Sequence, residues 1–195
     1  KRGGKLLWLR LTVAVVVTVV MAFPLYWMVL TAFSTRADLY APGLQLWPQH
    51  PTLQNFEIVF NQQHYYLHNF WRQLFNSFFI AISTGLITLF VATFAAFAIA
   101  RLKVRGGRTM MNLALATYLI PAAFLAIPMY KAMGSYGLLD TQASLILAMV
   151  ALASPYAIWV LKQASDKLPK ELDEAAVMDG ATSIQLFRLV YLPLM

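Results

Sequence analysis

The sequence predicts an all-α fold, that of a polytopic helical membrane protein, and three observations carry this prediction. Of the 195 residues, 60% are hydrophobic and only 12% are charged, which is about half the charged fraction of an ordinary soluble domain. The apolar residues form four long runs without any charge, and about 20 apolar residues in a helix can cross a bilayer. Basic residues gather where these runs end.

The distribution of the basic residues that give the net charge of +7 indicates a membrane topology and not a nucleic-acid-binding surface. The basic residues lie at the ends of apolar runs instead of on one helical face, and cytoplasmic loops of membrane proteins are rich in such residues. The chain has no cysteine, which excludes a disulfide, thiol catalysis and a cysteine metal site.

The first predicted span covers residues 11–33. A cleaved signal peptide is the alternative, but its apolar core would be only about 7–15 residues long. Pro24 is expected to kink the helix, which membrane spans tolerate. The basic residues that precede the span are Lys1, Arg2, Lys5 and Arg10.

Residues 34–72 are predicted to form an external polar and aromatic segment, irregular at first and with a short interfacial helix over 52–60. His64 and His68 are spaced one helical turn apart. A zinc site needs at least three protein ligands, and the sequence offers no third one nearby. Interfacial or partner-facing histidines are therefore favoured, and no metal site is predicted.

The second predicted span covers residues 74–100. Its end is rich in alanine, which permits close helix packing, although these residues could also line a pathway. A strongly basic turn follows at once and marks a cytosolic loop. Its basic residues are Arg101, Lys103, Arg105 and Arg108.

The third predicted span covers residues 109–130 and contains two prolines. A proline removes a backbone hydrogen bond and bends a helix, and the freed carbonyl groups need protein or a water-filled cavity as partners. This helix is the best candidate for lining a pathway, with a static kinked helix as the alternative. Its candidate pathway residues are Asn112, Thr117, Tyr118, Pro121 and Pro128. The three polar ones among them could equally bond neighbouring helices.

The fourth predicted span covers residues 141–161, with Pro155 near its inner part and Lys162 and Lys167 at its inner end. The resulting topology starts with a cytoplasmic N-terminus and returns to the cytoplasm after the second and fourth spans. Basic residues agree with it at both inner loops.

Residues 165–193 form a polar stretch after the last span, and its first half predicts a short helix. Pro169 suits a first helical position, because it lacks the N–H that would be unpaired there. The acidic residues Glu171, Asp173 and Glu174 then fall in the first turns, where the helix dipole favours negative charge. Asp179-Gly180 is a turn signal, and Gly180 can adopt the left-handed conformation that ends a helix.

The second half of this stretch predicts another helix, with Thr182 as its cap and Gln185 completing a capping box. Ala175 and Ala176 are small enough for another surface to approach the first helix closely. Pattern alone leaves two interpretations open, an ordinary cytosolic loop or a docking element.

A motif resemblance favours the docking element. Glu174-Ala175-Ala176, three residues, Gly180, nine residues, Val190, one residue and Leu192-Pro193 resemble the EAA loop of bacterial ABC importer permeases, in the carbohydrate, maltose-transporter-like branch. Val190 stands where the family usually has Ile. In that family the loop forms a coupling helix that docks in a groove of an ATPase subunit. The coupling residues that the resemblance implies are Glu171, Glu174, Ala175, Ala176, Asp179, Gly180, Leu192 and Pro193.

The resemblance also implies a fold, partners and a location. The fold is the type I ABC importer permease fold, in which residues 1–195 would be a permease domain with four of about six spans, incomplete after Met195. The partners are a second homologous permease, an ABC ATPase dimer and an external solute-binding protein. The location is the bacterial inner membrane.

The chemistry of the residues agrees with a mechanical role. No charged residue lies inside the four runs, which argues against proton coupling and fits an uncharged solute. The chain has no P-loop and no catalytic constellation, so no cofactor is expected and ATP and Mg²⁺ would be bound by the partner ATPase. We therefore expect a sugar or oligosaccharide importer permease. The alternatives are a permease for glycerol phosphate, peptide or amino acid, or a non-transporting membrane scaffold.

Overall fold

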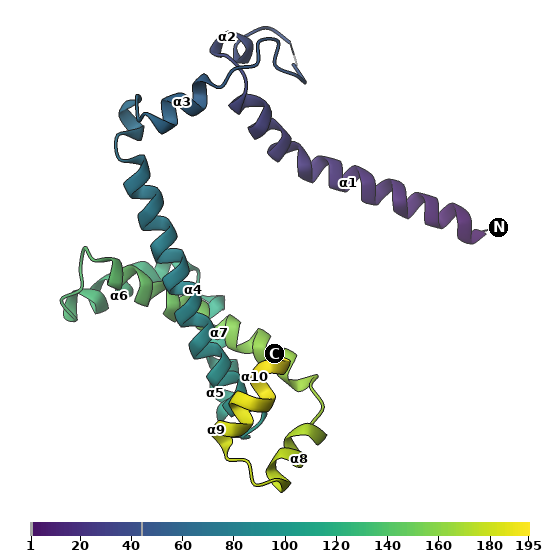
Figure 1. The fold of residues 1–195 in the computed structure, drawn as a ribbon, viewed down its shortest axis with the longest axis vertical. Helices are drawn as coiled ribbons and strands as arrows, with labels where there is room; N and C mark the ends of the chain where they lie inside the picture. Colours follow the sequence, from purple (N-terminus) through teal and green to yellow (C-terminus); the bar gives the residue numbers. More distant parts are fainter. Residues whose placement is uncertain (1, 44) are drawn as a thin grey trace. The chain divides into compact units, whose positions relative to one another are not determined.

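Helices make up all the regular secondary structure in the described part of the computed structural model, as the sequence predicts (Figure 1). The structure describes residues 2–43 and 45–195, and the side chains of residues 6–43 and 45–195. The chain divides into two units, Lys1–Leu74 and Phe75–Met195. Lys1, which the sequence places beside the first span, lies outside the described residues, as do the side chains of Arg2 and Lys5.

The first unit begins with helix α1 (Arg2–Ala32), which holds an apolar stretch long enough to cross a membrane, Leu6–Ala32. The helix starts earlier than the predicted span at residue 11, because Lys, Arg and Leu are good helix formers and extend it beyond the apolar run. Pro24 lies inside α1 without ending it.

Three short helices follow in the first unit: α2 (Arg36–Leu39), α3 (Gln54–Phe60) and the 3₁₀ helix η1 (Tyr65–Leu67). Helix α3 agrees with the short helix predicted over 52–60. Asn55 on α3 donates from its side-chain amide to the carbonyl oxygens of Ala32 and Ser34, over 3.1 and 2.9 Å. These bonds hold α3 against the end of α1, where the last carbonyl groups of a helix have no partner within it.

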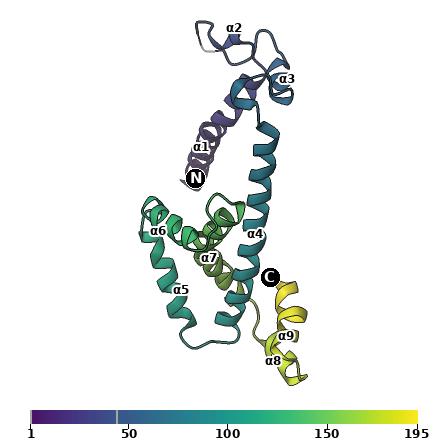
Figure 2. The same cartoon turned by 90° about the vertical axis from the view of Figure 1, so that its left-hand side faces the viewer.

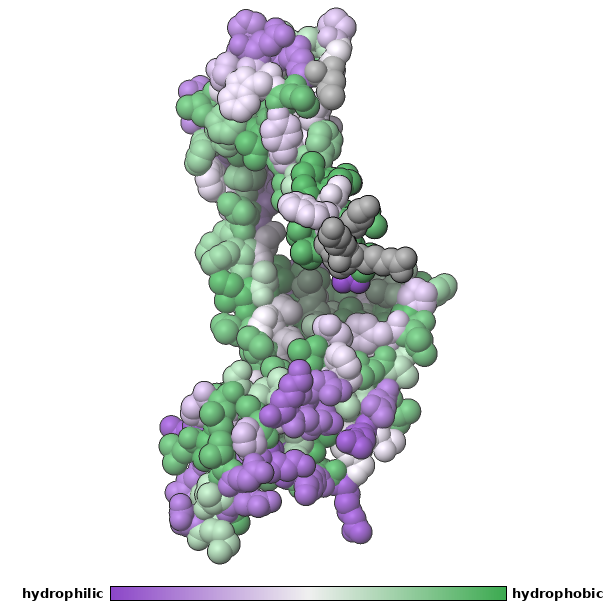
Figure 3. Space-filling view, turned by 90° about the vertical axis from the view of Figure 1, so that its right-hand side faces the viewer, coloured by the Kyte–Doolittle hydropathy of each residue, from purple (hydrophilic) through white to green (hydrophobic). Residues whose placement is uncertain are grey.

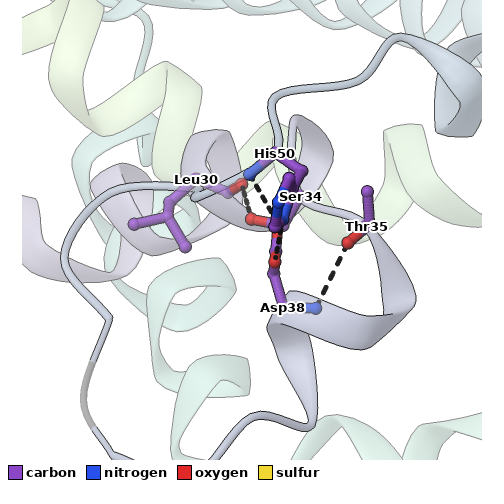
Figure 4. A network of polar contacts seen from close by, with 5 residues as sticks. All are labelled: Leu30, Ser34, Thr35, Asp38 and His50. Atoms are coloured by element: carbon purple, nitrogen blue, oxygen red, sulfur yellow. Dashed lines mark hydrogen bonds and ion pairs between the residues drawn. The ribbon is translucent and has the colours of Figure 1, made fainter.

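A buried carboxylate closes the loop between α2 and α3 (Figure 4). The Asp38 side chain, only 6% exposed, accepts a hydrogen bond from the backbone N–H of His50 and lies 3.0 Å from the Nδ1 atom of its ring. The hydrogen bond to the His50 ring and the backbone bond lower the pKa of Asp38 below its ordinary value of 3.8, against the opposing effect of burial. The ionised carboxylate is therefore the form that the loop stabilises.

The second unit contains most of helix α4 (Phe70–Ala100), which begins a few residues before the predicted second span. Ala92 and Ala96 are fully buried, so the small residues near the end of α4 allow close packing, as predicted. A tight turn leads into the next helix at Gly107, where an added Cβ atom would lie 3.0 Å from the Ile99 side chain.

The predicted third span over 109–130 is two helices and not one. Helix α5 (Gly107–Ala116) with the 3₁₀ turn η2 (Thr117–Leu119) meets helix α6 (Ala122–Ser135) at an angle of 110° (Figure 2). Ile120 is extended, as residues before proline tend to be, and Pro121 precedes α6 as its cap residue. Pro128 lies inside α6 without ending it. The described chain thus has three helices that could span a membrane, and four if the bent pair is one span.

Helix α7 (Gln142–Asp166) contains the predicted fourth span and continues beyond it. The Thr141 hydroxyl caps its start by accepting from the N–H of Ser144 over 3.1 Å. The Tyr118 hydroxyl, from η2, donates to the carbonyl oxygen of Leu152 on α7. This bond ties the bent segment to α7 near Pro155, whose missing N–H interrupts the hydrogen-bond ladder.

Replacing Asp38 with alanine is expected to speed hydrogen exchange at the His50 backbone amide, because that N–H loses its acceptor. Acidification should have the same effect, because it protonates the Asp38 carboxylate. The pKa of Asp38 in the folded protein is below 3.8, so the stabilisation is present above pH 3.8 and is lost as the pH falls through the folded pKa. Exchange rates corrected for intrinsic pH dependence measure both effects. His50→Gln keeps the backbone donor and is the control, with a smaller effect expected. Unchanged protection in Asp38→Ala would contradict this account of the loop.

Replacing Tyr118 with phenylalanine is expected to destabilise the protein by about 1 kcal/mol, the usual net contribution of one hydrogen bond. Thermal unfolding of the full-length permease in detergent measures the change. Tyr130→Phe is the matched control, because the Tyr130 hydroxyl has no hydrogen-bond partner within the described residues and is exposed. Equal melting temperatures for the two variants would show that the Tyr118 bond does not stabilise the fold.

Candidate functional site

The candidate site is the polar stretch of residues 165–193, which starts with the last two residues of α7 and which we call the polar elbow. Hydrophilic side chains gather at the end of the second unit that holds the elbow and the turn after α4, and apolar side chains cover its long helices (Figure 3). The elbow consists of helix α8 (Glu171–Met178), a left-handed turn, and a second helical segment from Ser183 to Leu194.

Helix α8 begins slightly later than the sequence predicts. Pro169 is not its first residue: Lys170 is the cap, and its carbonyl oxygen accepts hydrogen bonds from the N–H groups of Asp173 and Glu174, both over 3.0 Å. The prediction was wrong by two residues, because Pro169 suits the residues just before a helix as well as its first turn. The acidic first turn, with Glu171, Asp173 and Glu174, is confirmed.

The end of α8 has the geometry predicted for Gly180. This glycine has φ of +84°, and an added Cβ atom would meet nothing within 4 Å, so the backbone angle and not crowding makes glycine suitable here. The N–H of Gly180 donates to Val177 over 3.0 Å and the N–H of Ala181 to Ala176 over 2.9 Å. These two bonds form a Schellman motif, which pairs the last carbonyl groups of the helix.

The second helical segment starts with the predicted capping box. The Thr182 hydroxyl accepts from the N–H of Gln185, and the Gln185 side chain accepts from the N–H of Thr182 over 2.8 Å. After helix α9 (Ser183–Gln185) the chain widens into a π-helix, η3 (Leu186–Tyr191), and ends in α10 (Leu192–Leu194). The predicted residues Leu192 and Pro193 lie in α10. The π-helix was not predicted from the sequence.

The π-helix attaches the elbow to α4, beside which it lies in Figures 1 and 2. The ring of Phe187 stacks on Phe94 with centroids 4.4 Å apart, and the ring of Tyr191 lies 4.9 Å from that of Phe97. Aromatic pairs at such distances add to the stabilisation that burial gives. The buried core of the elbow is Phe97, Leu186, Phe187 and Tyr191, with Leu168, Ala176 and Val190 packed against it.

A buried ion pair attaches α8 to α4 independently of this core. The Arg101 guanidinium lies 2.7 Å from the Asp173 carboxylate, and the two side chains are 4% and 17% exposed. Arg101 also donates to the carbonyl oxygen of Leu168 over 3.4 Å. From sequence, Arg101 was expected only to mark the cytosolic side, and no local pattern signals its pairing with a residue so far along the chain.

The predicted coupling residues of α8 divide between two faces. Ala176 packs inward against the core, whereas Glu171, Glu174, Ala175 and Asp179 are exposed. The three acidic side chains among these make no ion pair within the described residues. Glu174 lines an open cleft of about 520 Å³ together with Val177 and the highly exposed Met178. An exposed acidic and apolar face beside a cleft can receive a basic, apolar partner surface.

The predicted pathway residues all lie on the bent segment and are all exposed in the chain. Two of their polar groups bond backbone: the Thr117 hydroxyl donates to Ala114 over 2.6 Å, and the Tyr118 hydroxyl to Leu152. The side-chain amide of Asn112 has no hydrogen-bond partner within the described residues. Pro121 marks the break, and Pro128 lies within α6.

His64 and His68 line a polar hollow in the first unit, and His64 accepts from the backbone N–H of Tyr66. In the described part of the chain, no group of three His, Cys, Asp or Glu residues is placed to hold a metal ion.

Several known proteins align with nearly the whole of this chain. The sulfoquinovosyl glycerol transport system permease protein SmoH of Agrobacterium fabrum is 32% identical over 95% of this chain and 64% of its own length. The diacetylchitobiose uptake system permease protein DasC of Streptomyces coelicolor is 29% identical over 93% and 64%. The trehalose/maltose transport system permease protein MalG of Thermococcus litoralis is 30% identical over 93% and 63%. The chain thus spans less than two thirds of the length of these relatives.

A solved structure has the same fold. A chain of a bacterial ABC transporter involved in the import of the acidic polysaccharide alginate matches with a TM-score of 0.78 at 22% identity, over 100% of this chain and 66% of that one. Residues 88–195, more than half of the chain and including the whole elbow, match the family described as binding-protein-dependent transport system inner membrane component. The chain belongs to this family of inner membrane transport components.

Proposed function

We propose that the chain is the permease subunit of an ATP-driven ABC importer that moves a sugar or oligosaccharide across the bacterial inner membrane. The observation that carries this proposal is the polar elbow, which presents an exposed acidic face on α8 and is anchored on α4 by its other face. The relatives SmoH, DasC and MalG, which are named as permeases for sulfoquinovosyl glycerol, diacetylchitobiose and trehalose/maltose, support the substrate class.

The proposed partners are a second homologous permease, an ABC ATPase dimer and an external solute-binding protein. The chain itself would have no catalytic site, and the ATPase would bind ATP and Mg²⁺. The basic turn after α4, in which Lys103 and Arg105 are exposed, supports the proposed orientation, because such residues favour the cytoplasmic side. The elbow and the N-terminus would then lie in the cytoplasm.

The proposed mechanism is the transmission of motion through a helix held in a groove. Helix α8 would lie in a groove of the ATPase, with Glu174 facing a basic or hydrogen-bond-donating group and Ala175 allowing close approach. When ATP binding closes the ATPase pair, α8 would move with the groove, and the packed spans would switch between outward and inward access as rigid bodies. The nucleotide-bound ATPase must therefore bind the two permease states with different affinity.

The Glu174→Lys variant tests this docking. Reversal of the charge on the exposed face of α8 is expected to weaken ATPase association about tenfold or more, since loss of one partner of a buried charge pair costs about 2–5 kcal/mol. Co-purification of the ATPase and solute uptake measure it. Glu57→Lys is the matched control, because Glu57 is an exposed acid on α3 in the external segment. If Glu174→Lys retained association and uptake, the docking assignment would fail and the scaffold alternative would gain support.

Gly180→Pro tests the same site through the backbone. Proline cannot adopt the φ of +84° that Gly180 has and has no N–H to donate to Val177, so the turn that ends α8 should not form. Association and uptake are expected to fall together. Normal values of both would show that the turn is not needed for coupling.

The substrate class is tested with the solute-binding protein of the same transport system. Neutral sugars or oligosaccharides are expected to raise its melting temperature, because a bound ligand stabilises the folded state by mass action. A panel of sugars, glycerol phosphate, peptides and amino acids screened by thermal shift measures this. A shift with glycerol phosphate, a peptide or an amino acid and none with a sugar would replace the proposed substrate.

A further inference from the structure

Arg101 occupies an unusual position for a residue of a basic cytosolic turn. It follows directly after the last residue of α4, Ala100, and its side chain is only 4% exposed. Arginine is rarely buried to this extent unless it is paired. Its neighbours Lys103 and Arg105 are exposed, so Arg101 differs from the rest of the turn in pointing into the protein.

The guanidinium group bonds the elbow at two places. One nitrogen lies 2.7 Å from the Asp173 carboxylate on α8, and another donates over 3.4 Å to the carbonyl oxygen of Leu168, just before α8. A guanidinium presents its donors in a fixed planar fork, unlike the single point charge of a lysine. Two bonds from one rigid group fix both the position and the direction of the start of α8 relative to the end of α4.

The three acidic residues of the first turn of α8 therefore have different roles. Asp173 is 17% exposed and faces Arg101, whereas Glu171 and Glu174 are exposed. Successive residues of an α-helix are about 100° apart around its axis, so an inward Asp173 leaves Glu174 turned toward the side. Only part of the acidic cluster is then available to a partner protein.

Chain connectivity does not join α8 to α4 directly, because helices α5, α6 and α7 come between them in sequence. Two non-covalent attachments make the connection. The aromatic core acts through η3, beyond the Gly180 turn, and the Arg101–Asp173 pair acts on α8 itself. Without the pair, α8 would be held by the two ends of the elbow and by Ala176.

We propose that Arg101 is a positioning residue that locks α8 to the end of α4 through Asp173, so that a displacement of α8 moves α4 with it. This rests on the proposed function of α8 as the helix that the ATPase grips. Asp173 serves the lock and does not contact the ATPase.

The first test measures the lock directly in the full-length permease before the ATPase is added, because the exposed Met178 lies beside Glu174 on the proposed docking face. Residues 1–195 contain no cysteine. With any cysteine elsewhere in the permease replaced, nitroxide labels at Lys103→Cys and Met178→Cys report the distance between the turn after α4 and the end of α8. Arg101→Met and Asp173→Asn are each expected to broaden the distance distribution, and the exchanged pair Arg101→Asp with Asp173→Arg to narrow it again. Arg105→Met is the matched control, since Arg105 is exposed and makes no ion pair in the described part of the chain. Distributions unchanged in both single variants, or equally broadened by Arg105→Met, would overturn the proposal.

The second test measures coupling in the assembled complex. Asp173→Asn keeps the size of the side chain, and the complex is expected to assemble. We compare the rate of ATP hydrolysis with solute-loaded binding protein to the rate without it. In Asp173→Asn the ratio of these two rates should fall about fivefold or more, which is the lower end of typical coupling between sites. Solute uptake should fall as well. An unchanged ratio would overturn the proposal, as would loss of ATPase association in Asp173→Asn, because Asp173 would then be a docking residue.

The two tests separate this inference from the proposed function. If the ATPase failed to associate with the unaltered chain, the proposed function would fail, while the label distances would still report whether Arg101 holds α8. The other case is that the ATPase associates with the unaltered chain and Glu174→Lys releases it. If the label distances and the hydrolysis ratio are then unchanged by the substitutions at Arg101 and Asp173, only the lock is rejected.

Discussion

The structure depends on one constraint: backbone N–H and carbonyl groups in an apolar environment need partners, and lipid supplies none. Long helices meet this requirement internally, which is why the apolar runs become α1, α4 and α7. Prolines interrupt this pairing. Pro155 lies inside α7 and has no N–H to donate to the Ala151 carbonyl, and the break before Pro121 places the extended residue Ile120 between two helices. The Tyr118 hydroxyl donates to a different carbonyl of α7, that of Leu152.

The elbow combines two tasks: one side packs against the end of α4, and the other presents a polar surface. The left-handed turn at Gly180 separates these tasks. Beyond the turn, η3 buries aromatic rings against α4. Before it, α8 turns Ala176 and Asp173 inward and leaves Glu171 and Glu174 exposed. Each face of this short helix carries both a small and an acidic residue, so attachment and the exposed surface use different side chains.

Sequence could predict the features that neighbouring residues determine. The helical fold, the capping box at Thr182 and the left-handed end of α8 at Gly180 follow from residue type and spacing within a few positions. The break at Pro121 was expected as a kink, but residue type alone does not give its 110° angle. The π-helix and the Arg101–Asp173 pair could not be predicted, because both depend on contacts between segments far apart in the chain.

Arg101 shows that basic residues in the same turn can have different structural roles, which a count of their charges does not distinguish. In the topology argument each basic residue near an inner helix end counts equally, since a positive charge resists transfer across the membrane. The structure distinguishes them, because Lys103 and Arg105 are exposed whereas Arg101 is buried and paired. A lysine at position 101 would keep the charge that sets orientation, but its single ammonium group would not reproduce a fork that bonds Asp173 and Leu168 together. The topology argument asks only for a positive charge at this position, whereas the two bonds to Asp173 and Leu168 use the planar shape of arginine.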